Sequence, residues 1–255
     1  MMKQTIAALL AAPLLIAAAP QRAVAAEEMA LENAPIDVRD RASLQAGART
    51  FVNYCLNCHG AALVRYNQLT AIGLTEDQIR DNLMFTARKI GEPMAVAMNR
   101  AEAKEWFGAA PPDLSVIARS RGADWLYTYL RGFYRDPTTA TGWNNAVFPN
   151  VGMPHVLWQL QGVRIRKETP LVRDGKPVEE NGMPVMQVSY ETVTPGTQSP
   201  EQYDRTVRDL VNFLVWMGEP QQLKRKEVGI FVLFVLGVLA LLTYMLKQEF
   251  WKDVH

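Results

Sequence analysis

Both cysteines of this 255-residue chain lie within one pentapeptide, Cys55-Leu56-Asn57-Cys58-His59. Two cysteines exclude a scaffold built on several disulfides, and they also exclude a zinc or iron–sulfur site with four cysteine ligands. Histidine is nearly as scarce, because only His155 and His255 lie outside the motif. Chemistry that depends on thiols or imidazoles must therefore centre on this short segment.

The spacing of the motif matches Cys-x-x-Cys-His, the attachment signature of a c-type haem. Residues three apart on a helical turn lie on the same face, so the thiols of Cys55 and Cys58 can both reach the vinyl groups along one porphyrin edge. The imidazole of His59 then projects beneath the ring and binds the iron. The sequence thus predicts one covalently bound haem c with His59 as an axial ligand.

A disulfide, a redox-active pair and a zinc site each fit the motif less well than a haem. A disulfide between the two cysteines leaves His59 without a role. A thioredoxin-like redox pair belongs to a βαβ context, which this sequence does not show. A zinc site needs a fourth ligand, and the only other histidines are His155 and His255.

A methionine is the expected sixth ligand of the iron. Two of the eleven methionines, Met153 and Met183, stand in the tripeptide Gly-Met-Pro. A mostly apolar run at residues 156–160 follows Met153 and suits a haem face, whereas charged residues around Met183 indicate a solvated hairpin. We therefore predict Met153 as the ligand, with His155 or an open position as alternatives. The expected role of three further methionines is core packing: Met84, Met94 and Met98.

The N-terminal segment is markedly apolar. Residues 1–26 combine a short basic start, a mostly Ala, Leu and Ile core and small residues before the first acids, which are the three parts of a secretory signal peptide. The segment is not rich in Arg and Ser, as a mitochondrial transit peptide would be, so export to a bacterial periplasm is favoured. We expect cleavage near Ala25 or Ala26.

Near the other end, residues 228–246 contain no charged side chain. A helix of this length spans about 28 Å, close to the hydrocarbon thickness of a bilayer. A basic juxtamembrane segment, residues 224–227, precedes it. We predict one transmembrane helix in the bacterial inner membrane, with residues 27–223 in the periplasm and residues 247–255 in the cytoplasm. The exported basic segment runs against the positive-inside tendency, but an exported domain of this size overrides it.

The charge balance argues against nucleic acid as a partner. The formal charge of the whole chain is +1, and residues 27–223 hold 20 Lys and Arg against 23 Asp and Glu, a net charge of −3. Domains that bind nucleic acid normally carry a basic excess. A mildly acidic exported domain instead attracts basic partners.

Apolar residues at helical spacing predict an amphipathic helix that runs from Leu44 through Phe51 to Cys55, directly into the motif. Gly47 weakens this helix but permits the close approach of another one. The first helix is therefore expected to pack against a second helix near the haem.

Further helices are expected over residues 75–88 and 124–134. The last helix of the exported domain begins at Ser199, and Gln202 completes its capping box. First and last helices packed around a haem are typical of class I cytochromes c. The predicted fold is mostly α: a class I cytochrome c-like domain with loop and β-hairpin insertions, the hairpin at about residues 161–196, and one C-terminal transmembrane helix.

With these features the chain resembles the cytochrome c1 family, the haem-carrying subunits of quinol–cytochrome c oxidoreductase (bc1) complexes. The resemblance covers nearly all of the chain after the signal segment. The haem motif alone indicates only a c-type cytochrome, whereas a Pro-Pro-Asp-Leu-Ser stretch and the C-terminal anchor are more specific. The residues that carry it occur in this order: the haem motif, Pro111-Pro112-Asp113-Leu114-Ser115, Ile117, Arg119, Arg121, Gly152-Met153-Pro154, Phe213-Leu214, Trp216 and Glu219-Pro220.

The resemblance implies roles for several residues. Met153 would be the axial thioether, and Arg121 would lie near a haem propionate, where a cation offsets a buried carboxylate. Pro111 and Pro112 would pack beside the imidazole side of the ring. In some family members an extra cysteine pair braces the loop that carries the axial methionine, here called the methionine loop. This chain lacks that pair.

The resemblance also implies partners. One electron would arrive from the Rieske iron–sulfur protein and leave to a cytochrome c, while the membrane helix would pack on cytochrome b in a dimeric complex. Two strong axial ligands leave no position on the iron for oxygen, so we expect conduction of electrons and no catalysis by this chain alone. The alternatives are a membrane-tethered electron shuttle and a haem enzyme or gas sensor with an open sixth position.

Overall fold

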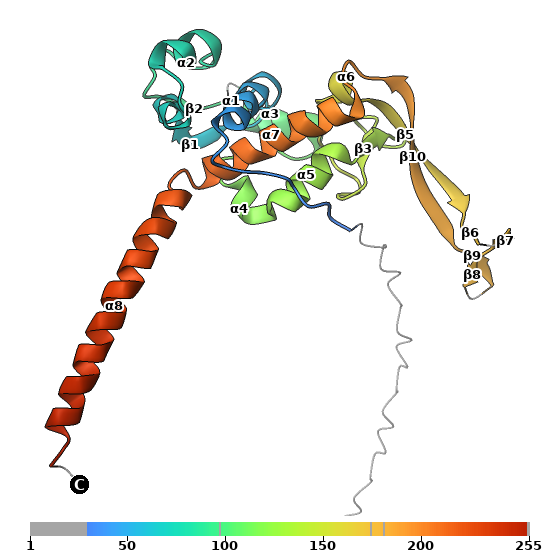
Figure 1. Cartoon of the computed structure of the whole chain (residues 1–255). Coiled ribbons are helices and arrows are strands. Elements are labelled where there is room, and N and C mark those ends of the chain that lie inside the picture. The colour runs from blue at the N-terminus through green and yellow to red at the C-terminus, as the bar shows by residue number, and fades with distance from the viewer. Residues whose placement is uncertain (1–29, 97, 174, 181, 254–255) are drawn as a thin grey trace, which may run out of the picture.

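The structure is a computed structural model of the chain that describes residues 30–96, 98–173, 175–180 and 182–253. The predicted signal peptide lies outside these residues. A body made mainly of helices occupies the centre, a long β-hairpin projects from one end, and one long helix leaves from the other (Figure 1). The chain is therefore mostly helical with small sheets, as the sequence predicts.

Two helices that are far apart in the sequence form the centre of the body. Helix α1 spans Arg41–Thr50, and helix α7 spans Pro200–Gly218. The apolar face of α7 is buried, and the capping box predicted at its start is confirmed. At the crossing, a Cβ added to Gly47 would stand 2.0 Å from the backbone oxygen of Asp209. Glycine thus lets the two backbones touch.

A buried polar network fixes the register of this crossing. The hydroxyl of Ser43 donates to the carboxylate of Asp209 at 2.7 Å. The amide nitrogen of Asn212 donates to the backbone oxygen of Asp37 at 2.7 Å and to the hydroxyl of Ser43 at 3.0 Å. Buried polar groups without partners are costly, so these bonds favour one alignment of the helices.

Helix α1 does not continue as a regular α-helix into the haem motif. The backbone widens into a π-helix, η1, over Phe51–Cys55. The N–H of Leu56 donates to the oxygen of Phe51 at 3.0 Å. Phe51, Val52 and Cys55 remain buried, so the apolar spacing predicts burial correctly but does not reveal the wider turn. Single π turns occur often at functional sites.

Two predicted helices are shorter than expected. The prediction over residues 75–88 is wrong beyond Asn82, because the buried Leu83 leaves the helical conformation. The prediction over residues 124–134 is wrong after Arg131, because Phe133 begins a strand that pairs in a sheet. The remaining helical elements have these bounds: the 3₁₀ helix η2 Tyr66–Ile72, α2 Glu76–Asn82, α3 Arg100–Phe107, α4 Ile117–Arg121, α5 Ala123–Arg131 and α6 Trp158–Gln161.

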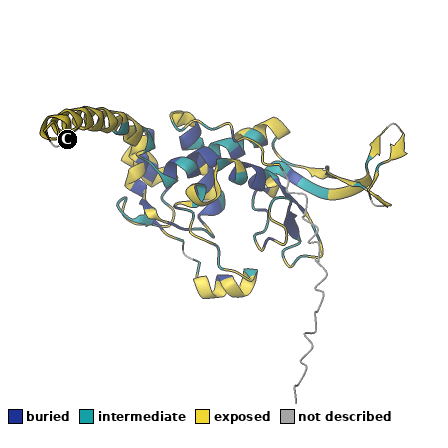
Figure 2. Ribbon diagram, turned by 90° about the horizontal axis from the view of Figure 1, so that it is seen from below, coloured by how far each residue is buried: buried dark blue, intermediate teal, exposed yellow. Residues whose placement is uncertain are grey.

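A four-stranded sheet in the order β10-β5-β3-β4 closes one side of the body. Strands β5 (Gly162–Pro170) and β10 (Met186–Pro195) pair antiparallel and form the projecting hairpin. Its outer part is mostly exposed (Figure 2). The remaining strands are short: β1 Ala61–Arg65, β2 Pro93–Met94, β3 Phe133–Arg135, β4 Trp143–Asn145, β6 Val172–Arg173, β7 Lys176–Pro177, β8 Glu179–Glu180 and β9 Met183–Pro184.

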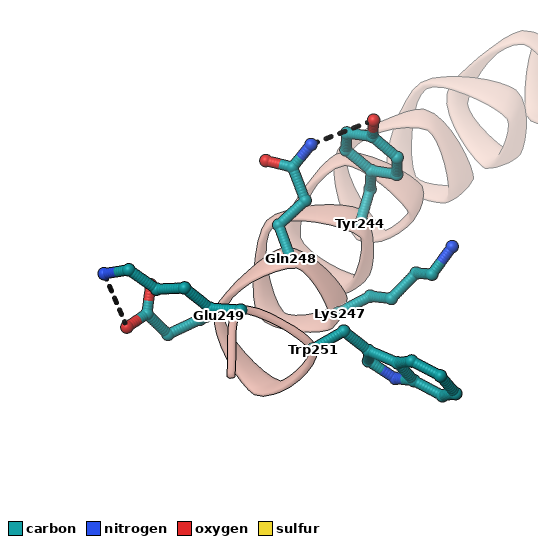
Figure 3. Close-up of a pocket in the computed structure, with 6 residues that line it drawn as sticks. Tyr244, Lys247, Gln248, Glu249 and Trp251 are labelled. Carbon is teal, nitrogen blue, oxygen red and sulfur yellow. Dashed lines mark hydrogen bonds and ion pairs between the residues drawn. The ribbon is translucent and has the colours of Figure 1, made fainter. Parts of the chain in front are cut away.

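Helix α8 spans Gln222–Phe250 and is the one helix in the described part of the chain that is long and apolar enough to cross a membrane. No side chain of this helix is buried in the body. At its far end Gln248 donates to the hydroxyl of Tyr244 at 3.0 Å, and Lys247 and Trp251 lie nearby (Figure 3). Such polar and aromatic residues mark a membrane–water interface. The length, composition and exposure of the helix fit a single-pass membrane anchor.

We predict that Gly47→Ala destabilises the protein. Alanine normally stabilises a helix interior by about 1 kcal/mol relative to glycine. Here the methyl group collides with the α7 backbone, which cannot move like a flexible side chain, so we expect a net loss of about 1–3 kcal/mol. Urea unfolding of the full chain in mild detergent measures this loss. Gly91→Ala is the control, because a Cβ there meets nothing within 4 Å. A Gly47 variant as stable as the control would contradict the proposed backbone contact.

Candidate haem site

The two cysteines and the histidine of the motif form one tight turn that begins at Cys55, the last residue of η1. The N–H groups of Cys58 and His59 both donate to the backbone oxygen of Cys55, at 3.1 and 2.8 Å. Both cysteines are free thiols, Cys55 buried and Cys58 half-buried. The turn therefore presents two unbonded thiols beside one imidazole, which is the donor set that covalent haem attachment needs.

The surroundings of the thiols do not suit the alternatives. Burial, with a smaller contribution from the nearby Cys58, raises the pKa of Cys55 to about 12. Burial also raises the pKa of Cys58. Zinc and redox-active pairs require thiolates, which this environment disfavours. The described residues also contain no cluster of three or more His, Cys, Asp or Glu side chains that could hold a metal ion.

The imidazole of His59 is oriented by a backbone carbonyl. Its Nδ1 lies 2.8 Å from the oxygen of Pro112. A proton on Nδ1 donates to that oxygen and leaves the Nε2 lone pair free for iron, the arrangement common among metal-binding histidines. Burial lowers the pKa of His59 despite the opposing effects of Pro112 and Asp113. The neutral, ligating form is therefore favoured.

The Pro-Pro-Asp-Leu-Ser stretch holds that carbonyl in place. The carboxylate of Asp113 accepts hydrogen bonds from the N–H groups of Ala62 and Ser115, at 2.8 and 2.9 Å. The hydroxyl of Ser115 accepts another from the N–H of Leu63 at 3.0 Å. This stretch is thus fastened to the strand that follows the haem motif, and Pro112 stays against the imidazole.

Met153 lies in the loop between β4 and α6 and is half-buried against the core. Its sulfur accepts a hydrogen bond from the hydroxyl of Tyr129 at 3.3 Å. A Cβ at Gly152 would stand 2.7 Å from the backbone oxygen of Phe107. The loop therefore presses against the end of α3, four residues before Pro111. Met183, in contrast, is 67 % exposed near the tip of the hairpin.

His155 is committed to packing. It is only 2 % exposed, its ring stacks on that of Phe133 at 4.8 Å, and it meets the Trp143 ring edge-on at 5.2 Å. Burial lowers its pKa to about 4, so the ring is neutral. These contacts favour a structural role over ligation. Met94 is fully buried as expected, and Met84 packs partly buried against the core.

The structure gives the two arginines Arg119 and Arg121 different surroundings. Arg119 forms an ion pair with Glu219 at 3.4 Å, at the junction with the membrane helix. The guanidinium of Arg121 lies over the ring of Trp125 at 5.1 Å and that of Phe148 at 6.0 Å. Among the described residues Arg121 has no carboxylate partner, so it is available to an anionic ligand.

A comparison with known protein families decides the family. The model of the cytochrome c1 family matches residues 32–254. The chain belongs to the cytochrome c1 family. Membership in this family implies a covalent haem c and a role as an electron-transfer subunit, and the anchor helix α8 fits the same family.

The relatives of this chain described here are named either cytochrome c1 or ammonia monooxygenase gamma subunit. Cytochrome c1 of Allochromatium vinosum is 47 % identical over 226 residues, 88 % of this chain and 90 % of that protein. Cytochrome c1 of Rhodospirillum rubrum is 31 % identical over 245 residues, 84 % and 83 % of the two chains. A Nitrosomonas europaea protein named ammonia monooxygenase gamma subunit is 50 % identical over 230 residues, 90 % and 91 % of the two chains.

The residues present fit a haem c. The turn offers two free thiols and a neutral imidazole with one nitrogen committed elsewhere. The loop between β4 and α6 adds the thioether of Met153, and α4 adds the guanidinium of Arg121, which has no carboxylate partner among the described residues. Sequence reasoning missed two contributors in this member of the cytochrome c1 family, the carboxylate of Asp113 and the hydroxyl of Tyr129. The only sequence signal for Tyr129 is its helical spacing with Trp125, which indicates packing and not a polar contact.

We predict that Asp113→Asn weakens the acid sensitivity of the fold. Burial raises the pKa of Asp113, but its hydrogen bonds with Ser115 and Ala62 outweigh this effect and lower the pKa overall. A lowered pKa contributes stability above the unfolded-state value of about 3.9. This contribution is lost as the pH falls through the folded-state value. Urea unfolding at about pH 7 and pH 3 should show a smaller difference for the variant than for the wild type.

Asp81→Asn is the control for this experiment, because it makes the same substitution at an exposed aspartate. Asp81 lies on α2, next to Arg80. It should keep the acid dependence of the wild type. An Asp113 variant with that same dependence would contradict the role of this carboxylate.

Proposed function

We propose that this chain carries one haem c, bound covalently by Cys55 and Cys58 and ligated by His59 and Met153. It passes single electrons from a Rieske iron–sulfur protein to a cytochrome c within a quinol–cytochrome c oxidoreductase complex. The observation that carries the proposal is the hydrogen bond from His59 Nδ1 to Pro112, because it frees one imidazole nitrogen for iron beside two free thiols.

The ligands determine which chemistry is open to the site. A bound haem supplies a one-electron couple between ferrous and ferric iron. The carbonyl of Pro112 orients the His59 ring and increases its basicity through the shared proton. The thioether of Met153 favours the ferrous state and raises the potential. With His59 and Met153 both bound to the iron, no position would remain for oxygen or peroxide, which suits electron conduction.

Arg121 completes the proposed site. Its guanidinium lies over Trp125 and Phe148 and has no acidic partner among the described residues. A cation at this position lowers the cost of burying a propionate. Pro111 and Pro112 contribute the wall on the imidazole side.

The junction with the membrane helix supports a fixed subunit over a tethered shuttle. Glu219 forms ion pairs with Arg119 of α4 and with Arg225 of α8. Only three residues separate α7 from α8, whereas a shuttle needs a longer flexible linker for reach. In the proposed dimeric complex α8 packs on cytochrome b in the bacterial inner membrane. The haem domain, with its net charge of −3 over residues 27–223, faces the periplasm and the C-terminus faces the cytoplasm.

We predict that this chain copurifies from membranes in mild detergent with a di-haem cytochrome b and an iron–sulfur protein. An affinity tag fused to the C-terminus and mass spectrometry of the captured proteins provide the measurement. Capture of the chain alone would favour the shuttle. Capture with monooxygenase subunits would favour the assembly that the name of the Nitrosomonas relative suggests. Either result would overturn the proposed complex.

We also predict that Met153→Ala lowers the haem potential sharply and lets carbon monoxide bind the ferrous protein without denaturant. Both effects follow from loss of the thioether ligand. Potentiometric titration and visible absorption spectra measure them. Met183→Ala is the matched control, because it alters the same tripeptide at an exposed place. Carbon monoxide binding by the wild type would exclude Met153 as the ligand and favour a sensor or haem enzyme.

A further inference from the structure

Helix α5 presents aromatic rings to the methionine loop. Trp125 and Tyr129 stack with ring centroids 4.7 Å apart and an interplanar angle of 11°. Tyr129 meets the ring of Phe133 edge-on at 5.1 Å. Tyr129 is 8 % exposed. Its ring is thus held from two sides, and the direction of its hydroxyl is fixed.

The Tyr129 hydroxyl points to sulfur. It donates to Sδ of Met153 at 3.3 Å, and no other hydrogen bond of this hydroxyl occurs among the described residues. A buried hydroxyl needs a partner, and a thioether is only a weak acceptor. The buried hydroxyl of Tyr203 has a more usual partner, because it donates to the backbone oxygen of Leu130 at 2.9 Å. Tyr129 therefore makes an unusual contact at the proposed ligand atom.

We propose that Tyr129 is a positioning residue for the axial thioether, which it orients and tunes through its hydrogen bond to Met153. This inference rests on the proposed ligation by Met153. A thioether sulfur has two lone pairs, so one can bind iron while the other accepts the phenol proton. The hydrogen bond withdraws electron density from sulfur and makes it a poorer donor. Ferric iron depends on that donation more than ferrous iron does, so the contact stabilises the reduced state.

The same stretch of chain also holds the proposed propionate partner. Arg121 ends α4, and its guanidinium lies over the ring of Trp125, which in turn stacks on Tyr129. Arg121, Trp125 and Tyr129 follow one another along the chain at intervals of four residues. The cation at the haem edge and the hydroxyl at the axial sulfur are thus linked through one shared indole ring.

The test is Tyr129→Phe in the full-length, haem-loaded protein in detergent. Phenylalanine keeps the ring and its stacking and removes only the hydroxyl. We expect the equilibrium constant for haem reduction to fall about two- to tenfold, the range of one ordinary hydrogen bond. A tenfold fall equals about 59 mV for one electron. Potentiometric titration measures the potential, and the sulfur-to-iron charge-transfer band of the ferric form reports on the ligand.

Tyr203→Phe is the matched control, because it also removes a buried phenol hydrogen bond but does not contact Met153. It should lower stability and leave both the potential and the band unchanged. A Tyr129→Phe protein whose potential and band match those of Tyr203→Phe would overturn the inference and leave only a packing role.

A failure of the proposed function can be distinguished from a failure of the inference about Tyr129. If Met153→Ala leaves the potential unchanged, sulfur is not the ligand, and both the proposed ligation and this inference fall. If Met153→Ala lowers the potential while Tyr129→Phe has no effect, ligation stands and only the role of Tyr129 is rejected. Copurification with other subunits is independent of both measurements.

Discussion

The contact between the backbones of α1 and α7 at Gly47 determines where the rest of the molecule lies. Helix α1 continues through the π turn into Cys55, and α7 is followed by the membrane anchor after three residues. A single helix crossing therefore relates the haem motif to the bilayer. The bonds among Ser43, Asp209 and Asn212 keep this crossing in one register.

Around this scaffold the proposed ligands are held by neighbouring groups that are not themselves proposed to bind the iron. The carbonyl of Pro112 orients the imidazole of His59, and the hydroxyl of Tyr129 donates to the sulfur of Met153. The methionine loop lacks the additional cysteine pair of some family members. Backbone contact at Gly152 and burial of His155 among aromatic rings take its place. Packing and directed polar contacts thus substitute for a covalent brace.

The sequence predicts elements well where one local signal suffices. The capping box at Ser199 and the apolar span each depend on a few neighbouring residues, and both occur as predicted. Phe133 fits a helical stripe with Tyr129, yet pairing with β4 draws it into a sheet. The π turn and the Tyr129 contact depend on distant segments, so spacing alone does not reveal them. The haem ligands themselves stay predictions.

Burial of Cys55 has a consequence for the order of assembly. In the folded body this thiol is 8 % exposed and belongs to the hydrophobic core, and its pKa is high. A protonated, enclosed thiol reacts slowly with anything that arrives from solvent. If Cys55 carries the haem as proposed, its thioether is therefore made while the chain is still open. In that case the porphyrin becomes a component around which the core condenses, and attachment of the haem accompanies folding of this domain.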